Sequence, residues 1–223
     1  MAFNFRITII YSDAENNYKK YYLYNFKMNT TLIFATNNPH KVEEIRTVLK
    51  NSFTIITLQE AGINIDIPEP HNTLEANASE KSKTIFQLTQ QNCFSEDTGL
   101  EVAALNGEPG VNSARYAGEE RNFENNIEKL LNNLEENVPR NAQFRTIISL
   151  IINRNEFLFE GICKGRIAEK KKGENGFGYD AIFIPDGSNK TFAEMEMEEK
   201  NLYSHRKKAT DKLIQFLNNY GKN

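Results

Sequence analysis

The sequence predicts an α/β protein built on a mixed β-sheet flanked by helices. Strand-like and helix-like stretches alternate between residues 32 and 134, and two long strand-like runs then follow each other at 144–152 and 157–167. Alternation favours parallel strands joined by helices, whereas consecutive strands favour antiparallel pairing. With 223 residues, 39% of them hydrophobic and 26% charged, the chain is long enough for one sizeable domain or two small lobes that share a core.

Residues 1–28 differ from the rest of the chain. A polar stretch at 13–20 interrupts the apolar pattern, and a second methionine, Met28, stands just before the first strong strand. We therefore expect residues 1–28 to be an N-terminal extension, disordered or a consequence of start-site choice, with a loose strand at 5–11. Residues 29–223 are expected to form a single domain.

The domain is expected to begin with a buried strand at Leu32–Ala35, a short and continuous apolar run. Asn38 can cap the following helix with Pro39 at its first position, and apolar residues recur on one helical face from Val42 to Leu49. A helix start beside Lys41 is suited to bind an anion. An ordinary capped helix with a surface lysine explains the same pattern equally well.

Two further strands are expected at 53–56 and 63–67, followed by a long helix. Glu69 lies between two prolines, whose fixed φ angles hold it rigidly. An amphipathic helix is predicted at about 73–91, and it carries Lys81. Its inward-facing residues are expected to be Leu74, Ala78, Ile85 and Leu88.

An acidic segment is predicted to lie where a buried strand ends. A strand at 92–95 leads to Glu96 and Asp97, Gly99 would permit a tight bend behind them, and a strand at 100–104 would pair nearby. The carboxyl edge of an α/β sheet is where ligands bind, and adjacent carboxylates call for a cation. A hard oxygen site suits Mg²⁺. Taken alone, the Glu-Asp pair is more simply explained as a solvated turn.

The second half of the chain predicts a loop at 107–118, a helix at 122–134 and the antiparallel strand pair. A glycine-rich loop at 173–180 carries two aromatic residues, Phe177 and Tyr179, and a strand follows at 181–185. Without other information, the two aromatic residues are best explained as core.

The final helix is predicted to begin after Ser204, its N-cap, and to face the core through Ala209, Leu213 and Leu217. His205 and Arg206 fall in its first turn, where positive charge opposes the helix dipole. A ligand oxygen near these two side chains would explain them better than helix stability does.

Composition excludes several classes of protein. A net charge of −3 lacks the basic excess of a general nucleic-acid binder, and no apolar run approaches the roughly 18 residues of a membrane span. Cys93 and Cys163 sit among apolar residues without metal-ligand spacing, which favours core positions in a reducing, cytoplasmic environment.

Three segments together resemble the inosine triphosphate pyrophosphatases. Thr36–Lys41 is similar to a Thr-Gly-Asn-x-x-Lys turn, and Ser95–Gly118 is similar to Ala-Asp-Asp-Ser-Gly-Leu followed by Gly-x-Pro-Gly-x-x-Ser-Ala-Arg-Tyr. The third segment is Gly176–Asp180 together with Lys200 and Ser204–Arg206. The resemblance covers residues 31 to about 218.

The resemblance implies two lobes around a long mixed sheet, an active cleft between the lobes, and a homodimer. It also implies Mg²⁺-dependent hydrolysis of noncanonical purine nucleoside triphosphates (ITP, dITP and XTP) between the α and β phosphates. The products would be a monophosphate and pyrophosphate, and the reaction would keep deaminated purines out of DNA and RNA.

The same resemblance implies a role for each matching residue. Asp97 would bind the metal together with Glu69 and accept a proton from the attacking water. Residues 36–41 and Lys81 would hold the triphosphate, Phe177 would stack on the purine, and other residues would read its edge. The implied substrate-binding residues are Thr36, Asn37, Asn38, Pro39, His40, Lys41, Lys81, Thr98, Phe177, Gly178, Tyr179, Asp180, Lys200, His205 and Arg206.

The chain departs from the family pattern at three places. Asn37 replaces a glycine, Glu96 replaces the first of two aspartates, and Ala76 replaces the glutamate of a Glu-Asn pair. Asn tolerates left-handed backbone geometry better than most residues, so the loop is expected to persist.

Two rival functions remain open. One is a non-catalytic nucleotide-binding or sensor module, against which the joint retention of Glu69, Asp97, Lys41 and Lys200 argues. The other is a pyrophosphatase of the septum-inhibitor type that acts on other modified nucleotides, against which the run Ser204–Arg206 argues. The sequence does not fix the preference among ITP, dITP and XTP, the exclusion of guanine, the dimer geometry or the use of Mn²⁺.

Overall fold

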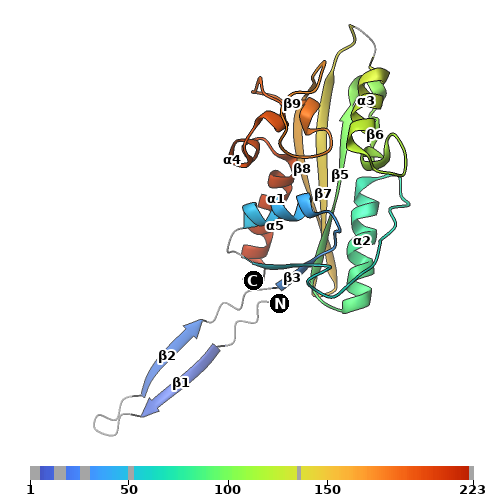
Figure 1. The fold of residues 1–223 in the computed structure, drawn as a ribbon. Helices are drawn as coiled ribbons and strands as arrows, with labels where there is room; N and C mark the ends of the chain where they lie inside the picture. Colours follow the sequence, from blue (N-terminus) through green and yellow to red (C-terminus); the bar gives the residue numbers. More distant parts are fainter. Residues whose placement is uncertain (1–5, 13–18, 26–30, 50–52, 135–136, 221–223) are drawn as a thin grey trace.

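The structure, a computed structural model, describes residues 6–12, 19–25, 31–49, 53–134 and 137–220. The strand expected at 5–11 occupies Arg6–Ser12 (β1) and pairs antiparallel with Lys19–Asn25 (β2), a strand that was not predicted. This hairpin forms a sheet of its own, apart from the main body (Figure 1). The expectations for residues 13–18 and Met28 concern positions outside the described residues.

The main body is built on a seven-stranded mixed sheet, as predicted. Its strands lie in the order β4-β3-β5-β7-β8-β9, and β6 pairs with β5. β3 runs parallel to both its neighbours, whereas the strands from β5 to β9 pair antiparallel. The strands are Thr31–Phe34 (β3), Thr54–Thr57 (β4), Cys93–Val102 (β5), Pro109–Gly110 (β6), Asn141–Ile152 (β7), Asn155–Ile167 (β8) and Phe183–Pro185 (β9).

Helices cover both faces of this sheet (Figure 1). α1 and α5 pack on one face, in a buried cluster that includes Phe34, Phe94 and Leu213. α2 packs on the other face, where its Ile85 joins Ile33 and Cys93 in a second cluster. The helices are Pro39–Leu49 (α1), Leu74–Thr89 (α2), Phe123–Asn133 (α3), Met197–Lys200 (α4) and His205–Asn219 (α5).

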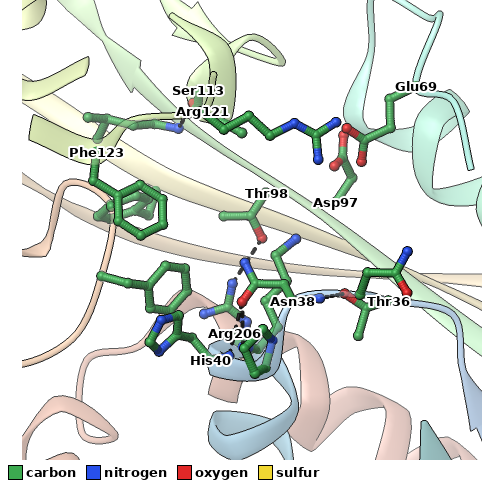
Figure 2. A pocket seen from close by; sticks show the side chains of 18 of the residues that line it. Thr36, Asn38, His40, Glu69, Asp97, Thr98, Ser113, Arg121, Phe123 and Arg206 are labelled. Atoms are coloured by element: carbon green, nitrogen blue, oxygen red, sulfur yellow. Dashed lines mark hydrogen bonds between the residues drawn. The ribbon is translucent and has the colours of Figure 1, made fainter. Parts of the chain in front are cut away.

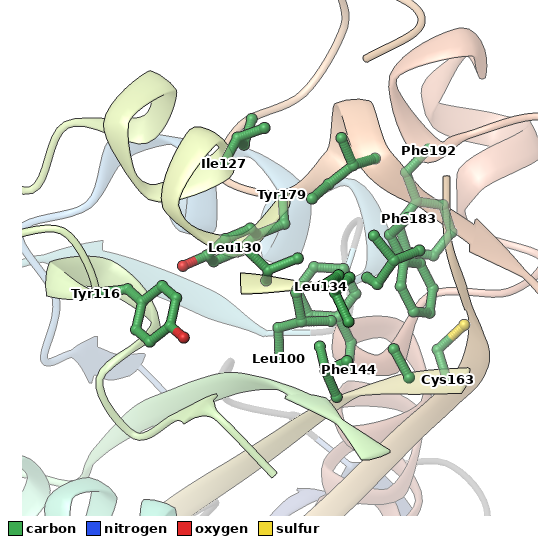
Figure 3. Packing of buried hydrophobic residues seen from close by; sticks show 14 of the residues in the cluster. Leu100, Tyr116, Ile127, Leu130, Leu134, Phe144, Cys163, Tyr179, Phe183 and Phe192 are labelled. Carbon is green, nitrogen blue, oxygen red and sulfur yellow. The ribbon is translucent and has the colours of Figure 1, made fainter. Parts of the chain in front are cut away.

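Two lobes share the long central strands, as expected. One holds the parallel strands with α1, α2 and α5, and the other holds α3, β6, β9 and the far ends of β5, β7 and β8 (Figure 1). Figure 3 shows the core of the second lobe, where Leu100, Phe144 and Phe183 pack beneath Leu130 of α3. Because β5, β7 and β8 run through both lobes, a single sheet holds the two lobes together.

The difference in length between β3 and β5 creates the cleft. Phe34, the last residue of the four-residue β3, pairs with Phe94, only the second residue of the ten-residue β5. The chain therefore leaves the sheet beside the beginning of β5 and enters the loop that starts α1. The remaining length of β5 extends past this loop into the second lobe.

The acidic turn predicted at Glu96–Asp97 is wrong, because β5 runs unbroken from Cys93 to Val102. Gly99 serves close approach rather than a bend. A Cβ at this position would lie 2.6 Å from the carbonyl oxygen of Gly110, in the neighbouring strand β6. Asp97 thus lies within a long strand, beyond the point where its shorter neighbour β3 ends.

The strand predicted at 63–67 is also wrong. The segment pairs with no strand in the described part of the chain, although Ile67 is buried and Ile63 and Ile65 pack against the same cluster as Ile85. Alternating apolar residues indicate that one side of an extended segment is packed against the core. A segment can be packed in this way without hydrogen bonding to a neighbouring strand. The helix predicted at 73–91 is found as α2, but Leu88, predicted to face inward, is 60% exposed.

α5 packs against β8 without an intervening side chain. A Cβ on Gly161 would lie 2.0 Å from the carbonyl oxygen of His205 and 2.5 Å from the backbone nitrogen of Ala209. Only glycine permits this backbone-to-backbone approach. Ser204 caps the helix by accepting a hydrogen bond from the backbone of Lys207, as predicted.

Candidate active site

A cavity of about 420 Å³ opens between the two lobes (Figure 2). It brings together residues from distant segments: the loop before α1, Glu69, α2, β5, the start of α3, the glycine loop and α5. All residues to which the sequence assigned metal or substrate binding line this cavity. The roles of those residues remain predictions, because position alone does not establish them.

The loop before α1 is held by its own side chains. Asn38 Oδ1 accepts hydrogen bonds from the backbone nitrogens of His40 and Lys41 at 3.0 and 3.3 Å, the N-cap predicted from the sequence. Thr36 Oγ1 accepts from the nitrogen of Asn38 at 3.1 Å (Figure 2). Asn37 donates to the carbonyl of Ile65 at 2.9 Å, which ties the loop to the extended segment that leads to Glu69.

Lys81 joins the two carboxylates predicted to bind metal. Its ammonium group lies 2.5 Å from Oε1 of Glu69 and 3.0 Å from Oδ1 of Asp97. Lys81 projects from α2, and Asp97 faces that helix because odd-numbered residues of β5, such as Ser95 and Cys93, point to the α2 side. One cation therefore holds two acids from separate segments in one corner of the cavity.

Burial affects the two acids differently. Loss of water raises the pKa of Asp97, and the charges of Lys81 and Lys41 offset this rise only in part. Burial also opposes ionisation of Glu69, but the charge and hydrogen bond of Lys81 outweigh it and lower the pKa of Glu69. Asp97 is thus the more basic of the two carboxylates.

The donor set of this corner fits Mg²⁺. Among the described residues no group of three or more His, Cys, Asp and Glu side chains gathers to hold a metal. Mg²⁺ does not require such a cage, because it is usually bound by one or two carboxylates together with substrate phosphates and water. Glu69 and Asp97 supply two such carboxylates at the cavity wall.

Glu96 belongs to a different ion cluster on the opposite face of the sheet. Arg206 donates to it through Nε at 2.7 Å and through a terminal nitrogen at 2.9 Å, and Lys41 lies 3.0 Å from it. Although burial opposes ionisation, Arg206 and Lys41 hold the pKa of Glu96 well below its usual range. Glu96 therefore stabilises the positions of two cations instead of sharing a metal with Asp97.

The cluster continues to Glu44, a residue that sequence reasoning missed. Its carboxylate accepts hydrogen bonds from Arg206 and from Lys200, the latter at 2.6 Å. Burial raises its pKa, but these two cations outweigh burial and lower the pKa to about 2. Glu44 is only 4% exposed although it is a charged residue of the amphipathic helix α1. No local feature of the sequence indicates that this glutamate is buried.

Lys200 and Asp180 shape the glycine loop. Asp180 Oδ2 accepts from Lys200 at 2.7 Å and from the backbone nitrogen of Phe177 at 2.9 Å. Gly176 has a φ of +78°, and a Cβ there would lie 2.1 Å from the same oxygen of Asp180. The loop therefore holds Phe177 at the cavity.

Aromatic rings meet at the end of the cavity away from Glu69. The ring of Phe177 stacks on His40 with centroids 5.0 Å apart, and Phe123 lies 6.2 Å from it in a tilted arrangement. Tyr179 is 4% exposed and donates its hydroxyl to the carbonyl of Ser113 at 2.9 Å, so most of this side chain belongs to the core.

His205 has a polar atom without a partner. It lies against Phe144 with ring centroids 4.6 Å apart, and its Nδ1 is buried without a hydrogen bond to the described residues. Burial and the nearby charge of Arg206 hold its pKa well below its usual range, so the imidazole is neutral at pH 7. Unpaired buried polar atoms are rare in folded proteins, which sets this histidine apart from an ordinary core residue.

Arg121 and Phe123 also line the cavity, and sequence reasoning did not find them. Both lie at the start of α3, in a stretch that resembles no motif and was predicted only as a helix beginning near residue 122. The geometry of the folded chain, not a sequence signal, brings them to the cavity.

Comparison with known proteins identifies close relatives. The sequence profile of the Ham1 family matches residues 32–216. The chain is 51% identical over 188 residues to the dITP/XTP pyrophosphatase of Flavobacterium psychrophilum, which covers 84% of this chain and 99% of that protein. It is 49% identical over 187 residues to the dITP/XTP pyrophosphatase of Porphyromonas gingivalis, with 83% and 96% covered. The solved structure of the Staphylococcus aureus Ham1 protein is similar, with a TM-score of 0.77, 40% identity, and 85% and 98% of the two chains covered.

Proposed function

The chain belongs to the Ham1 family, and on that premise we propose that it hydrolyses noncanonical purine nucleoside triphosphates such as ITP, dITP and XTP. The products are the nucleoside monophosphate and pyrophosphate. One observation carries the proposal: a single cavity has acids and cations suited to a triphosphate at one end and aromatic rings suited to a base at the other. The reaction would remove deaminated purines from the nucleotide pool.

Asp97 is the proposed catalytic base. A carboxylate whose pKa is raised by burial takes a proton from water more readily than an ordinary aspartate does. Lys81, 3.0 Å from Oδ1, holds the carboxylate in place, and the other oxygen remains for the attacking water. The proton of that water passes to Asp97 as the water oxygen attacks the α phosphorus and pyrophosphate leaves.

Glu69 and Asp97 would hold a Mg²⁺ ion together with the phosphates. When bound, the ion neutralises the charge that develops on the phosphate oxygens. Arg115 donates to the backbone carbonyl of Glu69 at 3.0 Å and so fixes the segment that presents this acid.

The triphosphate would lie along the loop before α1. The positive end of the α1 dipole favours a phosphate there, and Lys41 and Lys81 add positive charge. Catalysis of phosphoryl transfer depends mainly on positioning the phosphates and on stabilising their negative charge. These residues can do both.

Base choice would depend on His205 and its neighbours. Hypoxanthine and xanthine carry a keto oxygen at position 6, where adenine carries an amine. His205 lines the cavity, and as a neutral imidazole it can donate one N–H to that oxygen, whereas adenine would place a donor against it. Sites built on one such hydrogen bond discriminate strongly.

We further propose that the enzyme is a cytoplasmic homodimer that uses Mg²⁺ and acts without nucleic acid or membrane. Within the described ranges, no helix has the length and apolar character needed to cross a membrane. The net charge of −3 is unlike that of a nucleic-acid binder.

The decisive test offers ITP, XTP, ATP and GTP separately and analyses the products. Monophosphate and pyrophosphate from ITP and XTP alone are expected with Mg²⁺, and a chelator should stop the reaction until Mg²⁺ is restored. Release of orthophosphate would contradict the assigned bond and the roles of Lys41 and Asp97. Absence of turnover, with nucleotide binding retained, would favour a sensor module instead.

A further inference from the structure

Arg121 points into the active cavity but has no partner there. Figure 2 shows its side chain directed toward the carboxylates of Glu69 and Asp97. Its charge is one of those that lower the pKa of Glu69. Even so, its guanidinium makes no hydrogen bond or ion pair with the described part of the chain.

The other cations of the cavity are already paired. Lys41 lies 3.0 Å from Glu96, Lys81 bridges two acids, Lys200 contacts two more, and Arg206 is held by two buried glutamates. Arg121 is thus the cavity cation whose hydrogen-bond donors remain available, among the residues that the structure describes. An arginine presents a planar fork of donors that matches phosphate oxygens.

The position of Arg121 is fixed by the residues that follow it. Asn122 caps α3 by accepting a hydrogen bond from the nitrogen of Asn125 at 3.1 Å. Phe123 then lies beside Phe177, at the aromatic end of the cavity. Arg121 itself adopts a left-handed φ of 55°, which is uncommon outside glycine and turns the chain at this point.

We propose that Arg121 binds the terminal phosphates of the substrate and, after hydrolysis, the pyrophosphate product. The inference rests on the proposed function, since it concerns the phosphate end of the same cavity. It adds a ligand contact from the second lobe, across the cleft from Lys41. Binding of the terminal phosphates would thereby connect the two lobes.

Substitution must remove the guanidinium without disturbing the backbone. Arg121→Asn does so, because asparagine tolerates the left-handed region. Arg154→Asn is a matched control: Arg154 has a φ of 67°, is exposed in the turn between β7 and β8, and does not line the cavity. Arg121→Lys keeps the charge without the fork of donors.

The measurement is binding of magnesium pyrophosphate and of inosine monophosphate, each by titration calorimetry. Arg121→Asn should weaken pyrophosphate binding by about tenfold to a hundredfold, the effect of losing a hydrogen bond to a charged group. Monophosphate binding should change less than about twofold, Arg121→Lys should fall between wild type and Arg121→Asn, and Arg154→Asn should behave as wild type.

Unchanged pyrophosphate affinity in Arg121→Asn would overturn the inference. Equal weakening of both products would also overturn it, because it would indicate a general disturbance of the site. Failure of the wild-type protein to cleave ITP or XTP would overturn the proposed function instead, and the binding measurements keep these two failures apart.

Discussion

Glu96 and Asp97 are neighbours in β5, and their carboxylates lie on opposite faces of the sheet. Glu96 pairs with Arg206 of α5, whereas Asp97 pairs with Lys81 of α2. The two-residue period of a strand separates them, so adjacent negative charges do not share one environment. One acid is fully ionised and structural, and the other, with its raised pKa, is suited to proton transfer.

Replacement of Asp97 should abolish turnover with little effect on the fold. We expect Asp97→Asn to lower kcat by at least about a hundredfold, the usual contribution of a positioned base, while the melting temperature changes little. Steady-state kinetics and thermal unfolding would check this. Activity within tenfold of wild type would remove Asp97 from the role of base.

Glu44 should stabilise the fold in a pH-dependent way. Its pKa is about 2 in the folded protein against an ordinary value of 4.5, a difference worth about 3 kcal/mol. A lowered pKa gives stability that is complete above pH 4.5 and is lost as pH falls toward 2. We expect Glu44→Gln to lower the melting temperature at pH 7 and to flatten its dependence on pH in this window.

The matched control for Glu44 is Glu60, which pairs with Arg46 at 2.7 Å on the surface. An exposed pair of this kind contributes little, so Glu60→Gln should leave the melting curve nearly unchanged. If both variants melt alike at every pH, the buried cluster has no special part in stability.

Loss of the Phe177 ring should weaken binding more than it slows chemistry. Stacking of a base on an aromatic side chain is worth about 1–3 kcal/mol, so Phe177→Ala should raise KM for ITP by about fivefold to a hundredfold. Phe177→Leu keeps the apolar bulk without the ring, so its KM should lie between those of the wild type and Phe177→Ala. A fall in kcat at unchanged KM would contradict a stacking role.

His205 should control base discrimination. We expect His205→Ala to reduce the ratio of kcat/KM for ITP to that for ATP by about tenfold or more, because the donor for the 6-keto oxygen is lost. Competition between the two nucleotides would measure the ratio directly. A uniform loss with both substrates would instead assign His205 to packing against Phe144.

Removal of residues 1–27 should leave activity intact. The hairpin β1–β2 forms a sheet separate from the one that carries the cavity. Kinetics and solubility of a chain starting at Met28 would check this. An inactive or insoluble truncated protein would show that the main domain depends on the extension.

Features that depend on neighbouring residues in the sequence could be predicted. The caps at Asn38 and Ser204 and the antiparallel pair β7–β8 follow from local residue type and pattern, and the structure confirms them. The predicted mixed sheet follows from the order of such elements.

Features that depend on contacts between residues far apart in the sequence could not be predicted. Glu44 meets Lys200 across 156 positions of sequence, and only the folded chain brings them together. Gly99 was interpreted as a bend, because sequence does not distinguish a glycine needed for its φ angle from one needed for close approach to Gly110. Arg121 likewise reaches the cavity through the packing of α3.

The contact between Gly161 and the backbone of α5 limits how the specificity of this enzyme can be redesigned. Because the backbone of α5 contacts the backbone of β8 directly, a larger residue at 161 would displace His205 and Ala209 together. Directed evolution toward other bases should therefore retain this glycine and exchange side chains on a helix that stays where it is. In a library that randomises position 161, variants without glycine there would misfold and be lost before any selection for catalysis.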